Sequence, residues 1–178
     1  VGLRTGRIRQ LAAVRGDSGE QLRGSGGDLA AALARLDSLA DGCRFVLGHN
    51  LLAFDRPHLA AAAPRLRLLE LPVIDTLWLN PLAFPRHPYH HLVKHYQDGG
   101  LRRVQLNDPL LDAQLTLDLF HDQVVALQQR QREEADLLLA WHWLTTRDRR
   151  LAGVDSLFVM LRRRRCPHDA EAAQAIAC

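Results

Sequence analysis

Two acidic residues follow stretches that predict controlled local structure, and their side chains could hold a metal ion. Asp55 comes after an apolar run at residues 45–47 that is typical of a short buried strand. Asp112 lies one turn inside a predicted amphipathic helix. Carboxylate oxygens suit Mg²⁺ and Mn²⁺, and ligands gather at the carboxyl ends of strands in open α/β sheets. Both residues are therefore candidate metal ligands for hydrolysis of a phosphodiester bond.

Each carboxylate also has a purely structural interpretation. Asp55 could cap a short helix, because Asp is favoured at helix starts and Pro57 suits the first turn. Asp112 could be a solvated acid on a helix, which its spacing alone favours. Two carboxylates are also too few for a two-metal site.

Other polar residues could contact a substrate. His49 and Asn50 emerge where the predicted strand stops, after Gly48, which allows close backbone approach. A second group could supply a general base or bind phosphates, and it consists of Arg86, His87, His90, His91, Lys94 and His95. A surface helix with partly charged imidazoles explains that second group equally well.

The elements that must position these residues follow from hydrophobic periodicity and turn signals, and they predict an α/β protein. The predicted strands are at residues 7–14, 20–22, 45–47 and 71–74. The predicted helices are at residues 28–39, 56–63, 75–80 and 90–97, with a long one that starts at Asp108 and Pro109. We expect Asp28, Asp75 and Asp108 to cap their helices.

The chain after residue 130 changes character, and we interpret residues 131–178 as a helical extension or linker. A helix rich in Leu and Trp is expected at residues 134–145, with Trp141, His142 and Trp143 in the core rather than in a base-stacking platform. The basic run at residues 162–165 could contact nucleic acid, but solvated charge explains it equally well.

Composition narrows the class of protein. Of the 178 residues, 47% are hydrophobic and 24% charged, which is ordinary for a globular domain and argues against disorder. No signal peptide or long apolar run is evident, so we expect a cytoplasmic protein. The three cysteines lack the spacing of a disulfide framework or a structural zinc site. A net charge of +3 is compatible with a polyanionic partner.

Three motifs and the order of the elements resemble the DEDD 3′–5′ exonucleases, also called DnaQ-like or RNase T-like. The motifs are Gly48-His49-Asn50 with Phe54-Asp55, the Val-Ile-Asp-Thr-Leu of residues 73–77, and the Asn-Asp-Pro-Leu-Leu-Asp-Ala of residues 107–113. The resemblance covers about residues 7–127. It implies an RNase H-like fold, a mixed central sheet flanked by helices, in a domain of residues 1–130.

The resemblance also implies roles for particular residues. Asp55 and Asp112 would be catalytic ligands of Mg²⁺ or Mn²⁺ in a two-metal site, and Asn50, with His49, would position the substrate. Asp75 matches the family's Ile-Asp-Thr, but we interpret it as a structural helix cap.

Two features depart from the family pattern. The family's Asp-x-Glu on the opening strand is absent, so either the chain is truncated at its N-terminus or this copy has lost its metal pair. We favour truncation, because residues 8–14 match the family's second strand. The position of the general base, five residues before Asp112, holds Asn107, which cannot accept a proton usefully near neutral pH.

A looser resemblance supplies a replacement base. The spacing His90-x-Leu92-x-Lys94 and the Asn-Asp-Pro before Asp112 resemble exonuclease domains joined to RecQ-type helicases. His90 would then be the base, Lys94 and Asn107 would contact the substrate, and a helicase domain would belong to the same parent chain.

These observations predict a 3′–5′ exonuclease domain acting on single-stranded 3′ ends, with DNA favoured over RNA. The 178 residues alone should have weak activity or none. Two alternatives remain open at this point: a catalytically impaired module that binds or docks nucleic acid, and a structural interaction domain without affinity for oligonucleotides.

Overall fold

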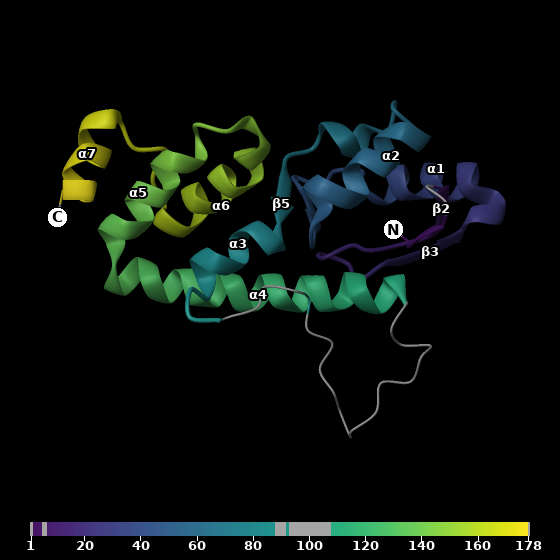
Figure 1. The fold of residues 1–178 in the computed structure, drawn as a ribbon, viewed down its shortest axis with the longest axis horizontal. Coiled ribbons are helices and arrows are strands. Elements are labelled where there is room, and N and C mark those ends of the chain that lie inside the picture. The colour runs from purple at the N-terminus through teal and green to yellow at the C-terminus, as the bar shows by residue number, and fades with distance from the viewer. Residues whose placement is uncertain (1, 5–6, 88–91, 93–107, 178) are drawn as a thin grey trace, which may run out of the picture.

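The structure, a computed structural model, describes residues 2–4, 7–87, 92 and 108–177. It is a mixed α/β fold in which helices predominate (Figure 1). The strands are β1 (Gly2–Arg4), β2 (Arg7–Val14), β3 (Gln21–Ser25), β4 (Val46–Gly48) and β5 (Val73–Asp75). The α-helices are α1 (Leu29–Leu39), α2 (Arg56–Ala62), α3 (Thr76–Ala83), α4 (Pro109–Glu133), α5 (Ala135–Thr145), α6 (Ala152–Arg162) and α7 (Asp169–Ala177). Short 3-10 helices are η1 (Gly26–Asp28), η3 (Arg67–Glu70) and η5 (Arg149–Leu151), and η2 (Leu51–Asp55) is a π-helix.

The strands form two separate sheets among the described residues. β1, β2 and β3 make an antiparallel sheet in that order, and β4 pairs with β5 in parallel. The α/β prediction is thus confirmed, but the single mixed central sheet is not what these residues form, because β1 pairs only with β2 and no described strand joins β1 to β4.

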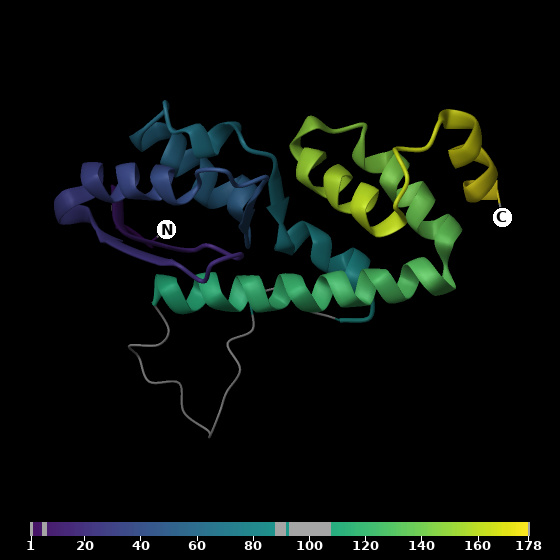
Figure 2. The same cartoon turned by 180° about the vertical axis from the view of Figure 1, so that it is seen from behind.

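Helix α4 runs along the molecule and contacts both halves of it (Figures 1 and 2). Towards its start it packs against β2, β3 and β4, and it also contacts α3, α5 and α6. The strands of the first sheet lie at one end of the molecule and α5, α6 and α7 at the other, with β5 between them. A 25-residue helix is long enough to connect the two ends, since each residue adds about 1.5 Å.

Two hydrophobic clusters form the core. One joins the first sheet to α1, α2 and η3 through Ile8, Leu11, Leu22, Ala32, Leu33, Leu59, Leu66 and Leu68. The other includes residues from both sides of position 130, namely Ile74, Leu79, Ala83, Phe120, Leu127, Leu138, Val154, Leu157 and Phe158. The helices after residue 130 therefore share a core with β5, α3 and α4.

The contact between α6 and β5 is unusually close at Gly153. A Cβ atom at that position would lie 2.2 Å from the Val73 carbonyl oxygen, well inside van der Waals contact. Only a residue without a side chain lets the helix lie directly on the strand. The prediction did not include α6, although its buried residues Val154, Leu157 and Phe158 recur at helical spacing.

The predicted helix caps are confirmed at two of three positions. The Asp75 side chain accepts a hydrogen bond from the Leu77 N–H, and the Asp108 side chain accepts from Leu110 and Leu111. Asp28 precedes α1 but makes no capping bond, because the preceding residues already form the 3-10 helix η1.

Several predicted boundaries shift. β4 is Val46–Gly48 rather than 45–47. Phe45 is 38% exposed, and its ring lies tilted against that of Phe120 instead of lying in a fully buried strand. β5 also begins two residues later than predicted, and the weak edge strand is longer, as β3. The predicted helix at residues 90–97 lies outside the described residues, except for Leu92. Among the described helices, none has the length and apolar character to span a membrane.

Candidate functional site

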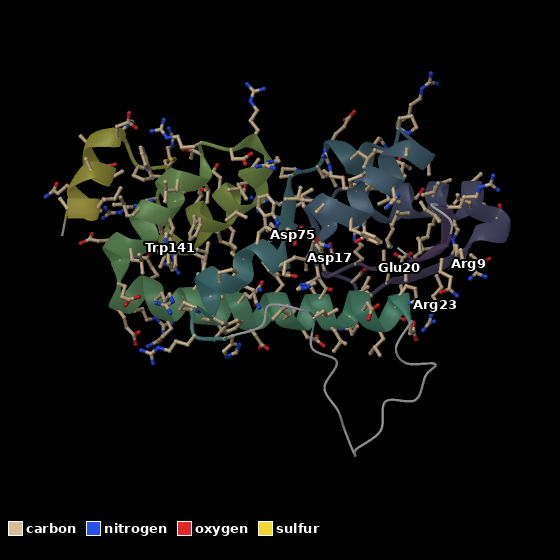
Figure 3. The ribbon with its side chains drawn as sticks, viewed as in Figure 1. Arg9, Asp17, Glu20, Arg23, Asp75 and Trp141 are labelled. Carbon is tan, nitrogen blue, oxygen red and sulfur yellow. The ribbon has the colours of Figure 1, made fainter. Side chains whose placement is uncertain are left out.

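The candidate site is built on the carboxyl ends of the parallel strands β4 and β5. Gly48 pairs with Asp75 at the last position of both strands. The Asp75 side chain is 1% exposed and accepts three backbone hydrogen bonds, from Asn50 at 2.8 Å, Leu52 at 2.9 Å and Leu77 at 3.0 Å. One buried carboxylate thus starts α3 and also holds the turn after β4, which confirms its structural interpretation. Figure 3 places Asp75 between the end with Arg9 and Arg23 and the end with Trp141.

The turn after β4 has an unusual backbone. Asn50 has a φ of 61° and lies in the left-handed region, which Asn tolerates better than most residues. The π-helix η2 follows and ends at Asp55. Single π-helical turns are rare and often occur at functional sites. This local geometry places Asp55 directly after a turn that Asp75 fixes.

Asp55 is half-buried and lies directly before α2. It occupies the position before α2, with Pro57 in the first turn as predicted, but its own backbone is helical (φ −69°, ψ −42°) and its side chain makes no capping bond. Asp55 thus stands where α2 starts, as one of its two interpretations predicts, but without the side-chain capping bond that this interpretation expects. Its role as a metal ligand stays a prediction.

His49 and Thr76 link the two strand ends. The Thr76 hydroxyl donates to the Gly48 carbonyl at 3.3 Å, and His49 Nδ1 lies 2.9 Å from the same hydroxyl oxygen. His49 is half-buried, and this bond fixes the orientation of its ring.

Gln123 is a site residue that the sequence did not reveal. Its side chain is fully buried on α4, and its Nε2 donates to the Thr76 carbonyl at 2.9 Å and to Asn80 Oδ1 at 2.8 Å. It therefore holds α4 against the start of α3. The available signal was a glutamine among apolar positions of a predicted helix, which is not specific.

Asp112 is half-buried in the first turn of α4, as predicted. Its backbone carbonyl accepts the Thr116 hydroxyl at 2.7 Å, and the preceding cap Asp108 is paired with Arg23 of β3 at 3.1 Å. The start of α4 is thus tied to the first sheet. In the described part of the chain, Asp55 and Asp112 do not belong to a group of three or more possible ligand side chains. Their chemistry suits Mg²⁺ or Mn²⁺, but the described residues do not assemble a complete metal centre around them.

Three other predicted site residues, His90, Lys94 and Asn107, lie outside the described residues. Of the predicted basic and histidine cluster, Arg86 and His87 are described, and the His87 ring stacks on Phe84 with centroids 5.2 Å apart. The roles predicted for His90, Lys94 and Asn107 stay predictions.

A different group brings three possible metal ligands together in the described residues. His142 on α5, Asp155 on α6 and Cys166 place ligand atoms within 4.8 Å of one another. His142 is fully buried, as the core interpretation of this segment predicts, and its ring stacks on Phe158.

The hydrogen bonds of His142 show that it is already committed. Arg162 Nη1 lies 2.7 Å from Nδ1, and since a guanidinium can only donate, Nδ1 must accept. The ring proton is therefore on Nε2, which donates to Asp155 Oδ1 at 2.9 Å. A metal ion on Nδ1 would displace Arg162, and one on Nε2 would leave the Nδ1–H facing the guanidinium. The three residues Arg162, His142 and Asp155 form a hydrogen-bonded charge chain rather than a prepared metal site.

The environment keeps His142 neutral. Burial lowers the pKa of His142, and the positive charge of Arg162 lowers it further, whereas the bond to Asp155 acts in the opposite direction. The net result is a pKa below the ordinary value of 6.5. A neutral imidazole is the state that both hydrogen bonds require.

Comparisons with known proteins give no further assignment. The sequence matches no family model, and no curated protein or solved structure matches it.

Proposed function

We propose that the chain is a nucleic-acid-processing domain of the 3′–5′ exonuclease type, with an RNase H-like origin, that acts on single-stranded 3′ ends and favours DNA. One observation carries the proposal: two of the motifs that resemble the DEDD exonucleases meet in space. The turn of the first motif is held by Asp75 of the second through the N–H groups of Asn50 and Leu52. Sequences 25 residues apart thus form one unit, at the strand ends where open α/β sheets bind ligands.

In this proposal Asp55 and Asp112 hold Mg²⁺ or Mn²⁺. A bound metal ion would supply activation of water and stabilisation of the leaving oxygen. The position of Asp55 supports this role, because it ends the π-helix that follows the turn held by Asp75. The resemblance requires two further carboxylates in an Asp-x-Glu on the opening strand, and these are absent from β1. We therefore assign no catalytic step to the described residues alone.

Binding of Mn²⁺ tests the assignment of the two carboxylates. Titration followed by electron paramagnetic resonance should show that Asp55→Asn and Asp112→Asn each weaken Mn²⁺ binding by roughly tenfold or more, since each removes a ligand. Asp122→Asn is the matched control, because Asp122 is an exposed acid on the same helix as Asp112. Equal affinity in all four proteins would overturn the metal assignment.

Digestion of single strands tests the activity itself. A protein to which an N-terminal strand with Asp-x-Glu has been added should degrade 3′-labelled single strands in the presence of Mn²⁺, and the same protein with Asp55→Ala should not. Equal digestion by the two proteins would contradict the proposal.

A second candidate is a non-catalytic module that binds or docks nucleic acid, within a chain that also carries a helicase domain. The observation that favours it is the lack of a third ligand beside Asp55 and Asp112 in the described residues. This candidate predicts binding of oligonucleotides that is the same with Mn²⁺ and with EDTA. Absence of binding even at low salt, where phosphate contacts are strongest, would instead indicate a structural interaction domain.

A further inference from the structure

A run of four arginines begins at Arg162, the last residue of α6, and only Arg162 makes a hydrogen bond to a buried side chain. Arg162 bonds to His142, as described above. Arg163, Arg164 and Arg165 are exposed, and none of the three has an ion pair with another described residue. We call these three residues the arginine loop. It concentrates a charge of +3 at one point of a chain whose whole net charge is +3.

The backbone of the arginine loop is held at both ends. Arg163 has a φ of 53°, a left-handed conformation that glycine or asparagine adopts at lower cost after a helix. On one side, Arg162 is fixed by its bond to the buried His142. On the other, Pro167 is buried, and Asp169 accepts from Trp143 Nε1 at 2.8 Å and from Arg147 at 2.5 Å. The three arginines therefore lie on a short segment whose two ends are fixed.

The acids that follow the arginine loop have other partners. Asp169 is taken by Trp143 and Arg147, and Glu171 accepts the His168 N–H at 3.0 Å. Neither carboxylate forms an ion pair with the arginine loop, so the positive charge of the loop is not neutralised by these neighbours. An exposed cluster of guanidinium groups is suited to phosphate, which it can bind through paired N–H donors.

We propose that the arginine loop is a docking site for the phosphate backbone of single-stranded nucleic acid, separate from the site at Asp55 and Asp112. The choice of nucleic acid as the partner rests on the proposed function, because a domain that acts on the end of a strand also needs contacts to the rest of that strand. The arginine loop should not distinguish one base sequence from another, since phosphate contacts are the same for every base. It sets affinity and its dependence on salt.

The test measures binding of a fluorescent oligo-dT by anisotropy at several salt concentrations, in EDTA so that no metal site takes part. The variant carries Arg163→Gln, Arg164→Gln and Arg165→Gln. Three phosphate contacts on a single strand account for a change of about 2 in the slope of log affinity against log salt. The variant should therefore bind more weakly at low salt, with a slope lower by about that amount.

Two further variants distinguish the effect of the position of these arginines from the effect of net charge alone. Arg7→Gln, Arg9→Gln and Arg35→Gln remove the same charge from exposed positions in the half of the molecule with the first sheet, where Figure 3 shows Arg9. This control should keep the slope of the unaltered protein. Changing residues 163, 164 and 165 to Lys keeps the charge and should keep most of the slope as well. Thermal unfolding checks that each variant is folded.

Three results would overturn the proposal. One is an equal loss of affinity for oligo-dT in the loop variant and in the control, which would mean that net charge alone governs binding. Another is an unchanged slope in the loop variant. In the third, the loop variant still binds oligo-dT but no longer binds vesicles of phosphatidylserine and phosphatidylcholine, to which the unaltered protein binds. That result would assign the loop to an anionic membrane. None of these measurements depends on Mn²⁺, so failure here is distinguishable from failure of the metal assignment.

Discussion

Asp75 shows how a single side chain can shape the backbone of a candidate site. Its carboxylate accepts three backbone N–H groups from two segments and is almost completely buried. A buried acceptor with three donors is difficult to replace, because any change leaves backbone N–H groups without partners. The turn that leads to Asp55 therefore depends on a residue of the next strand.

Asn50 allows backbone and side-chain roles to be separated. Because its φ is 61°, Asn50→Val should lower the free energy of unfolding by about 1–2 kcal/mol, whereas Asn50→Gly should change it little. Urea unfolding at constant pH measures both. If the Asn50 side chain positions substrate, the Gly variant should also bind oligo-dT more weakly while remaining folded. Equal stability of the Val and Gly variants would contradict the left-handed conformation.

The charge chain at His142 predicts a dependence of stability on pH. The folded-state pKa of His142 lies below 6.5, so the unfolded state binds its proton more readily. This contribution to stability is complete above about pH 6.5, the ordinary value for histidine, and is lost as the pH falls towards the folded-state pKa.

His142→Gln isolates that contribution, because glutamine can still accept from Arg162 and donate to Asp155 without titrating. Between pH 7 and pH 5, the unaltered protein should lose more free energy of unfolding than this variant, as measured by urea unfolding. His121→Gln, at an exposed position on α4, is the control and should lose as much as the unaltered protein. Parallel curves for all three proteins would show that His142 does not titrate as described.

At the scale of elements, the contact between α6 and β5 decides how the C-terminal helices pack. Gly153 lets the helix backbone approach the Val73 carbonyl, and Val154 and Phe158 then fill the core beside Ile74. The same strand ends at Asp75, so β5 connects this helix packing to the candidate site.

Gly153→Ala should reduce the free energy of unfolding by about 1–3 kcal/mol, because the added methyl group would overlap a backbone atom that cannot move independently. Gly27→Ala is the matched control: a Cβ there would meet no atom within 4 Å, so its effect should stay within about 0.5 kcal/mol. Thermal or urea unfolding compares the two. If Gly153→Ala left the free energy of unfolding unchanged, α6 would not lie directly on β5.

On the scale of the whole molecule, α4 is the element that joins the parts. Its first turn carries Asp112 beside the first sheet, Gln123 in its middle holds the start of α3, and Leu127 near its end lies in the core shared with α5 and α6. One helix thus contacts the first sheet, the start of α3 and the C-terminal helices.

Local signals made much of this architecture predictable. The starts of α3 and α4 were found because capping by Asp75 and Asp108 involves neighbours only two or three residues away. β2, α1 and α5 were found because their apolar spacing is a local property. Asp28 did not cap α1 as expected, because η1 precedes that helix and changes the backbone before it.

The sequence by itself determined the places of β2, α1, α3, α4 and α5 and the capping carboxylates Asp75 and Asp108, since these depend on residues close together in the chain. Only the tertiary structure decided that Asp75 holds the turn before Asp55, and that both ring nitrogens of His142 are hydrogen-bonded, to Arg162 and Asp155. It also decided that β1 and β4 belong to separate sheets among the described residues. The physical reason is that burial, strand pairing and side-chain hydrogen bonds join residues distant in sequence, and local spacing carries no record of those partners.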